Sequence, residues 1–179
     1  MNFIIRKAVL EDQAEIEKLI AQSVRGLSSD DYTEREIELS IKSVFGVDVD
    51  LIADDTYYVA VADEKIVGCG GWSKRKTLYG ASVYAGSRDA RELDPRTDAA
   101  KIRAFFIHPN WARKGIGTAI LEACEREAKS FRFQKAEMMA TLPGVKLYET
   151  RGYWGDERVG IDIGEGEKIV CLKMEKRLA

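Results

Sequence analysis

A short segment of the chain combines two glycines with two basic residues in a pattern that can bind phosphate. The segment Arg113–Thr118 reads Arg-Lys-Gly-Ile-Gly-Thr. Because Gly115 and Gly117 allow a tight turn, successive backbone N–H groups can point into one concavity. A helix that begins here adds unpaired amides and a dipole that favour an anion. The basic residues add positive charge, and no acidic residue lies between Asp98 and Glu122.

The same glycines are also consistent with a loop that only shapes the turn between a strand and a helix. A P-loop requires a more widely spaced pair of glycines followed by Lys and then Ser or Thr, and this spacing is absent. A Rossmann fingerprint requires a third glycine where this chain has Ile120, and an acidic residue where it has Thr141. Neither of these two nucleotide-binding patterns therefore fits.

A strand, this loop, a helix and a second strand form a predicted βαβ unit. Consecutive apolar residues in Lys101–Ile107 are typical of a strand covered on both faces, and a His-Pro pair ends it. Apolar residues recur at helical spacing after the loop, and Ala136–Thr141 has the pattern of another strand. Such a unit crosses over right-handed, with its two strands parallel. The expected buried side of the helix consists of Ile116, Ile120, Cys124 and Ala128.

The remaining sequence predicts further helices and strands around this unit. Thr33 is a suitable N-cap for a helix, and alternating apolar residues predict two hairpins. Residues 73–98 are polar and interrupted by glycine and proline, so no element is assigned to them. In chain order the other expected elements are a strand over Phe3–Lys7, a helix with Ile16, Leu19, Ile20 and Val24 buried, a helix with Ile37, Ile41, Val44 and Phe45 buried, strands over Thr56–Ala62 and Lys65–Trp72, a short helix from Pro143 to near Gly152, and strands over Val159–Ile163 and Val170–Met174.

Length and composition favour one domain over residues 1–179. The chain is 45% hydrophobic and 32% charged, which suits a packed core. A net charge of −2 indicates no general attraction to nucleic acid. No stretch is apolar enough for a membrane span or a secretory signal. Three scattered cysteines and one histidine suggest neither a disulfide framework nor a metal site. A reduced, cytoplasmic location is therefore expected.

Three segments carry a resemblance to a known family. Arg103–Leu121, RAFFIHPNWARKGIGTAIL, contains a strand, His-Pro, a basic glycine loop and a helix. Thr141–Tyr153, TLPGVKLYETRGY, carries a Tyr before a Gly-aromatic pair, and Ile4–Ile20 reads as a strand and a helix. In this order they resemble the GNAT superfamily of acyl-CoA-dependent N-acyltransferases. Ala112 departs from the family's usual Arg or Gln, which weakens the match only slightly because backbone amides provide most of the phosphate binding.

The resemblance implies an α+β fold with a mixed, mainly antiparallel, twisted sheet flanked by helices. In that family the two parallel strands splay apart beside a bulge, expected here near Phe105–Ile107. The pantetheine arm of acetyl-CoA, the co-substrate, would bind the opened strand edge like an added strand, and its pyrophosphate would reach the glycine loop. No metal is expected. The residues implied in acetyl-CoA binding are Phe106, Ile107, His108, Arg113, Lys114, Gly115, Ile116, Gly117 and Thr118, the first three through their main chain.

The resemblance also implies transfer of the acetyl group to a primary amine of a small molecule or peptide, directly within a ternary complex. Tyr148 lies where the family commonly has a phenol that protonates the departing thiolate, although its spacing from Val145 alone favours packing. Some members use a Glu on the first splayed strand as base, and here Arg103 and Ala104 occupy that place. Glu137 is the nearest carboxylate by sequence, but it is more typical of an ion-paired strand face. Loss of the amine proton through water is therefore expected.

Two features hint at the acceptor. Asp30–Asp55 contains nine acidic and two basic residues, and an acidic wall would attract a cationic amine, whereas a solvated acid-rich surface is the simpler explanation. Trp72 could place its indole at the acceptor mouth, although core packing is commoner for Trp. Two other functions stay open: a non-catalytic acyl-CoA-binding or sensing domain, which would not need Tyr148, and a nucleotide-binding α/β enzyme of another kind. An exposed C-terminal hairpin is compatible with a homodimer.

Overall fold

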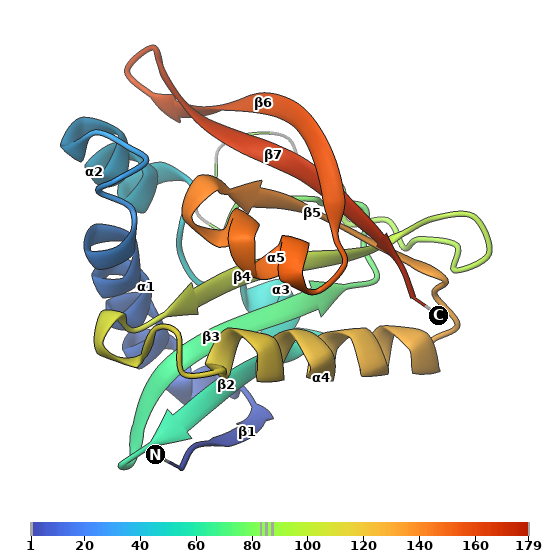
Figure 1. Cartoon of the computed structure of the whole chain (residues 1–179). Helices are drawn as coiled ribbons and strands as arrows, with labels where there is room; N and C mark the ends of the chain where they lie inside the picture. The colour runs from blue at the N-terminus through green and yellow to red at the C-terminus, as the bar shows by residue number, and fades with distance from the viewer. Residues whose placement is uncertain (1, 83, 85, 87, 179) are drawn as a thin grey trace.

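The structure is a computed structural model, and it describes residues 2–82, 84, 86 and 88–178. Within these residues seven strands form one mixed sheet in the order β1-β2-β3-β4-β5-β7-β6 (Figure 1). Strands β4 and β5 are parallel, and the other neighbouring pairs are antiparallel. The strands are β1 (Ile4–Lys7), β2 (Tyr57–Ala62), β3 (Lys65–Ser73), β4 (Ala100–Ile107), β5 (Lys135–Thr141), β6 (Trp154–Gly164) and β7 (Glu167–Arg177). The helices are α1 (Gln13–Leu27), α2 (Glu34–Ser43), α3 (Val49–Ala53), α4 (Ile116–Ser130) and α5 (Val145–Thr150), with short 3₁₀ helices η1 (Leu10–Asp12), η2 (Pro109–Trp111) and η3 (Leu142–Gly144).

Helices cover both faces of the sheet, and each face has its own hydrophobic core. Helices α4 and α5 pack on one face, in front of the sheet in Figure 1, and α1, α2 and α3 pack on the other. The expected apolar stripes of α1 and α4 are buried, from Ile16 to Val24 in α1 and from Ile116 to Ala128 in α4. The mixed, mainly antiparallel α+β fold predicted from the sequence is thus confirmed.

Helix α2 begins where its predicted cap lies, whereas α3 was not predicted. The Thr33 side chain accepts a hydrogen bond from the Glu36 backbone N–H at 3.2 Å, and the Glu36 carboxylate accepts one from the Thr33 N–H at 2.7 Å. Helix α3 has five residues, which is too short for an apolar period to be recognised. The described part of 74–99 forms a loop with one isolated bridge, between Arg75 and Glu92.

Strands β4 and β5 pair only at their N-terminal ends. Their ladder joins Ala100 to Ala136 and ends where Ile102 faces Met138. Beyond that point β5 continues its pairing with β7, and Figure 1 shows β4 and β5 diverging toward the side where α5 lies. The predicted splay of the two parallel strands is therefore present.

A bulge in β4 accompanies the divergence. Cys69 pairs with Phe106 and Gly71 pairs with Arg103, so that Ala104 and Phe105 together face the single residue Gly70. Ala104 adopts a left-handed backbone conformation with φ of 57°, which is unusual for a non-glycine residue. The extra residue bends the strand. The bulge begins one residue before the segment in which the sequence placed it.

Candidate functional site

The glycine loop leads directly into the first turn of α4 and presents its backbone to solvent. Gly115 is the N-cap of α4 with φ of 84°, and Arg113 also has a positive φ of 60°. The first N–H that bonds within the helix belongs to Ala119, which donates to the Gly115 carbonyl at 2.9 Å. The amides of Ile116, Gly117 and Thr118 precede this ladder and have no backbone partner within the part of the chain that the structure describes, as is usual at a helix N-terminus. This geometry can bind an anion such as a diphosphate.

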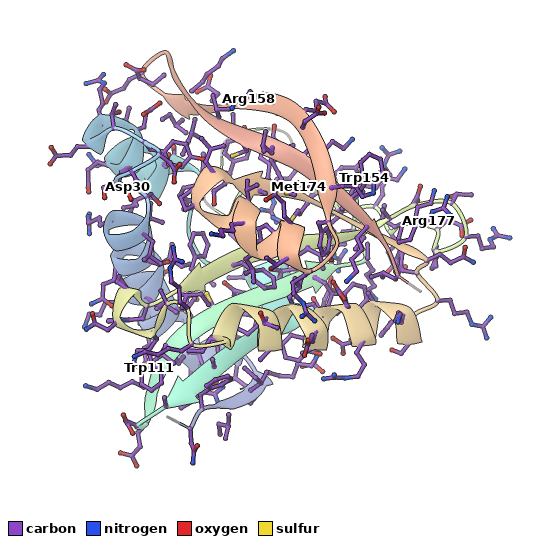
Figure 2. All side chains as sticks on the ribbon, viewed as in Figure 1. Asp30, Trp111, Trp154, Arg158, Met174 and Arg177 are labelled. Carbon is purple, nitrogen blue, oxygen red and sulfur yellow. The ribbon has the colours of Figure 1, made fainter. Side chains whose placement is uncertain are left out.

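Side chains around the loop add positive charge and leave its centre open. Arg113 and Lys114 are exposed, and Lys114 Nζ donates to the Asn110 carbonyl at 2.7 Å and lies 5.1 Å from the ring of Trp111. Figure 2 shows Trp111 in the segment that leads into α4. Apart from Gly115 itself and its two chain neighbours, no described residue has a heavy atom within 4 Å of the place that a Cβ on Gly115 would take. The backbone there is therefore accessible to a ligand.

Gly117 allows α4 and α5 to approach one another closely. A Cβ at this position would lie 2.8 Å from Cδ2 of Leu147 on α5. The glycine therefore sets the packing of the helix that carries Tyr148, in addition to contributing a backbone amide at the start of α4.

A pocket lies in the gap between β4 and β5. Arg103 to Phe106 of β4, Met139 and Thr141 of β5, and Tyr148 of α5 contribute to its walls. Residues 44–46 and Asp48, before α3, and the loop at 78–81 also line the pocket. The pocket thus joins the separated strand ends to part of the acid-rich segment, which the sequence suggested as an acceptor wall, and to the loop at 78–81, which the sequence did not place at the site.

Tyr148 is both packed and part of the pocket wall. Only 7% of the residue is exposed, and its ring lies 6.2 Å from that of Phe105 and 6.1 Å from that of Tyr153, edge to face in both pairs. No hydrogen bond to its hydroxyl is formed by the described residues. Burial raises the pKa of Tyr148 above its usual value, with a smaller effect from the neighbouring Cys124. The phenol therefore stays protonated at neutral pH and can donate into the pocket.

Tyr32 fixes the segment that leads to Tyr148. Its hydroxyl donates to the Val170 carbonyl at 2.7 Å and accepts from the Leu142 N–H at 2.9 Å. It thereby joins the chain before α2 to β7 and to the residue that follows β5. The sequence analysis did not identify Tyr32, because the contact spans more than a hundred positions and leaves no local pattern.

The three residues at the end of β4 have different surroundings. The ring of Phe106 lies in the pocket wall, 5.6 Å from that of Phe45. The Ile107 N–H donates to the Ser23 hydroxyl of α1 at 3.0 Å. His108 donates its N–H to the Val67 carbonyl at 2.9 Å, and its Nδ1 accepts from the Asn110 N–H at 3.2 Å. The imidazole thus caps η2.

A buried ion pair in the pocket wall was not predicted. The side chains of Arg103 and Asp48 are only 4% and 1% exposed, and Arg103 Nη2 lies 2.6 Å from Asp48 Oδ2. Arg88 Nη2 lies 3.1 Å from the other oxygen, Asp48 Oδ1. Burial lowers the pKa of Arg103, although Asp48 opposes this. An arginine inside a run of apolar strand residues is the signal in the sequence that points to such a group.

Two residues suggested by the sequence lie away from the pocket. The Glu137 carboxylate pairs with Lys101 and lies 3.8 Å from Lys173, beside the paired ends of β4 and β5. Trp72 is fully buried, and its Nε1 donates to Glu127 at 2.7 Å. The expectation of an indole at the acceptor mouth is therefore wrong, and the core and ion-pair alternatives hold.

Arginines neutralise much of the acid-rich segment. Asp54 pairs with Arg75 at 2.6 Å, and Asp50 pairs with Arg88 at 2.9 Å. Together with the paired Asp48, these contacts leave no excess of negative charge on the pocket wall. Within the described residues, no group of three or more His, Cys, Asp or Glu side chains could hold a metal ion. No described helix is long and apolar enough to cross a membrane.

Comparisons with known proteins agree with this architecture. The model of the acetyltransferase (GNAT) family matches residues 21–153. A GCN5-related N-acetyltransferase from Rhodopseudomonas palustris has a TM-score of 0.73 and 20% identity, over 99% of this chain and 96% of that one. The PaiA N-acetyltransferase from Thermoplasma acidophilum, in complex with coenzyme A, has a TM-score of 0.67 and 16% identity, over 99% of each chain. An N-acetyltransferase from Staphylococcus aureus Mu50 has a TM-score of 0.64 and 13% identity over both full chains. Curated proteins gave no significant match.

At these identities the solved structures show the shared fold, and the family model shows the membership. The matched residues include the glycine loop, the diverging strands and Tyr148. The match covers more than half of the chain and agrees with the observed geometry, so the protein belongs to the acetyltransferase (GNAT) family.

Proposed function

We propose that this protein transfers the acetyl group of acetyl-CoA to a primary amine of a small molecule or peptide. The observation that carries the proposal is the end of the β4–β5 ladder at Ile102 and Met138, which opens a pocket near the amides that begin α4. A thioester carrier with a diphosphate needs both features: a gap for its extended arm and donors for its phosphates.

The glycine loop and the open edge of β4 would each bind a different part of acetyl-CoA. The amides of Ile116, Gly117 and Thr118, with the charges of Arg113 and Lys114, would hold the diphosphate. The unpaired edge of β4 beyond Arg103 would hydrogen-bond the pantetheine arm. Because the Ile107 amide donates to Ser23, that arm would bind nearer the bulge or would exchange partners with the serine.

Transfer would occur in one ternary complex. The neutral amine attacks the thioester carbonyl, so that the C–N bond forms and the C–S bond breaks. Tyr148 would donate its proton to the departing thiolate. Burial raises the pKa of this phenol, and the same burial would make the thiolate a stronger base, so the two groups stay matched.

The amine proton would leave through water. Asp48 is the carboxylate of the described pocket wall, and two guanidinium groups hold it. Glu137 is engaged by Lys101 outside that wall. Neither carboxylate is free to act as a base. An amine that is already partly neutral at the working pH suits this arrangement.

Two measurements test the function. CoA should raise the melting temperature of the protein more than ATP or NAD does at equal concentration, and free thiol should appear when acetyl-CoA and an accepted amine are both present. Protection by ATP or NAD instead of CoA would support a nucleotide-binding enzyme. Tight CoA binding without thiol release for any amine of a broad panel would support a sensing domain.

A further inference from the structure

The pocket connects the two faces of the sheet. Of the residues in its wall, Ile102, Met138 and Tyr148 belong to the core beneath α4 and α5. Phe45 and Met139, also in the wall, pack on the core beneath α1, α2 and α3. The glycine loop begins α4 and lies with Tyr148 on the first face. A carrier held at that loop would enter the gap from this face, which leaves the other face for the acceptor amine.

The wall on this second face offers an apolar surface. Its half-buried side chains include Phe45, Tyr79, Ala104, Phe106 and Met139. The rings of Phe45 and Phe106 lie 5.6 Å apart, edge to face, with an angle of 66° between them. An apolar group bound here would remove part of these side chains from water, which favours binding. An aromatic ring would also pack well against the Phe45–Phe106 pair.

The charged groups at the wall are already paired. Among its described residues the charged ones are Asp48 and Arg103, whose side chains are 1% and 4% exposed and lie 2.6 Å apart. Arg88 pairs with both Asp48 and Asp50 outside the wall, so the whole cluster is neutral. A second charged group on the acceptor would therefore lose water at this wall without gaining an ion-pair partner.

We propose that the acceptor is a monoamine whose remaining substituent is uncharged and apolar, such as a 2-arylethylamine, and that Phe45, Phe106 and Met139 contact this substituent. The proposal rests on the proposed function and names its class of acceptor. The amine nitrogen would lie in the gap near Tyr148, and the substituent would extend toward the end of α2. A polyamine, an aminoglycoside or a free amino acid carries further charge that this wall does not match.

Two isosteric pairs of amines test the proposal by thiol release from acetyl-CoA. Pentylamine and 1,4-diaminobutane differ in a terminal methyl against an ammonium group, and 4-methylpentylamine and 4-aminobutanoate differ in an isopropyl against a carboxylate group. We expect kcat/KM to be at least about tenfold higher for the apolar member of each pair. It should be about threefold higher again for 2-phenylethylamine than for pentylamine. Equal values within the pairs, or higher values for the charged members, would overturn the proposal.

A longer acyl chain is the alternative occupant of the same apolar space. Hexanoyl-CoA would therefore be compared with acetyl-CoA, with pentylamine as the acceptor. We expect a lower kcat/KM with hexanoyl-CoA, because its chain and the substituent of the amine would compete for one space. An equal or higher value would place the acyl chain there and overturn the proposal.

Two variants at Phe45 test whether this face contacts the acceptor. Phe45→Glu and Phe45→Gln differ in charge and have nearly the same size. A carboxylate here would supply the partner that a second ammonium group lacks in the wild-type protein. The kcat/KM ratio of 1,4-diaminobutane to pentylamine should be about tenfold higher in Phe45→Glu than in Phe45→Gln. Equal ratios would show that the acceptor lies elsewhere, and if neither variant folds, the wild-type comparisons still decide.

Binding of the acetylated products separates this proposal from the proposed function. Calorimetry with CoA-loaded protein would compare N-pentylacetamide with N-acetyl-1,4-diaminobutane, and we expect the first to bind about tenfold more tightly. This preference without thiol release from any amine would support the ligand class and refute the activity. Thiol release from all the amines without preference would refute the ligand class and leave the activity intact. Without turnover, equal affinities or no binding by either product would overturn both.

Discussion

Replacing Tyr148 with Phe tests whether the phenol acts in the reaction. The change removes one hydroxyl that has no hydrogen-bond partner among the described residues and leaves the ring contacts with Phe105 and Tyr153 in place. Because no partner is left unsatisfied, the free energy of unfolding should change by less than about 1 kcal/mol. General acid catalysis typically contributes about 10²- to 10⁴-fold. A thiolate is a good leaving group, so we expect the low end, a kcat about 100-fold lower.

Tyr153 provides the matched control. Its hydroxyl is buried, with the Glu125 carboxylate as its charged neighbour. Its ring lies 6.1 Å from that of Tyr148, and Tyr153 is not part of the pocket wall. Tyr153→Phe makes the same chemical change one ring away and should leave kcat within about twofold of wild type. Steady-state thiol release with saturating acetyl-CoA, and thermal unfolding of all three proteins, measure both effects.

The reasoning fails in either of two ways. If Tyr148→Phe keeps kcat within about threefold of wild type while CoA binding is unchanged, the phenol is only packed, as its spacing alone suggested. If Tyr153→Phe loses as much activity as Tyr148→Phe, the effect comes from the packing of α5 and not from proton donation.

Three other features lead to predictions. Gly115 has a positive φ and open space around it, so Asn and Asp fit there equally well. Because only the charge differs, Gly115→Asp should weaken CoA binding about tenfold relative to Gly115→Asn at low salt. Equal dissociation constants for the two variants would exclude a diphosphate site. Burial opposes ionisation of Glu127, but hydrogen bonds from Lys7, Trp72 and Tyr58 outweigh it and lower its pKa. The ionised form of Glu127 thus stabilises the fold above the unfolded-state pKa, and this contribution is lost as the pH falls through the lower folded-state pKa. Unfolding curves should show that Glu127→Gln lowers the free energy of unfolding by about 2 kcal/mol at pH 7. The difference between the two proteins should be smaller in acid. Burial raises the pKa of Cys69 and Cys171 to about 12, so a thiol reagent at pH 8 should label them only after unfolding, and rapid labelling of the native protein would contradict their burial.

The sequence predicted the elements whose signals are local. Helix α4 follows from four apolar residues at helical spacing, and all four are buried. The cap at Thr33 is a contact within four residues of the chain. Helix α3 was missed because five residues give no period, and the loop after β3 was not assigned because its order comes from distant ion pairs such as Arg75 with Asp54. Local patterns thus predicted the longer helices and strands. The short helix and the loop could not be predicted, because they give no local pattern or depend on long-range contacts.

The candidate site also contains some residues that local motifs predict and others that depend on long-range contacts. The glycine loop and the position of Tyr148 could be predicted from motifs, since each lies within one continuous segment. Arg103 was considered only as a residue that cannot be a base, and Asp48 only as one acid among nine. Their pairing depends on the bulge at Ala104, which only the family resemblance placed in this part of β4, and on the path of the chain before α3, which has no sequence signature of its own. The buried ion pair is therefore the part of the pocket wall that sequence patterns describe least.

Packing and chemistry are not alternatives for the groups that face this pocket. The burial that makes Tyr148 look like a core residue also keeps its phenol protonated, which a proton donor requires. The burial that makes Arg103 costly also strengthens its attraction for the Asp48 carboxylate, because few water molecules compete. Both groups face the gap that opens where the β4–β5 ladder ends at Ile102. The strand divergence thus creates both the pocket between β4 and β5 and the buried surroundings of the side chains that line it.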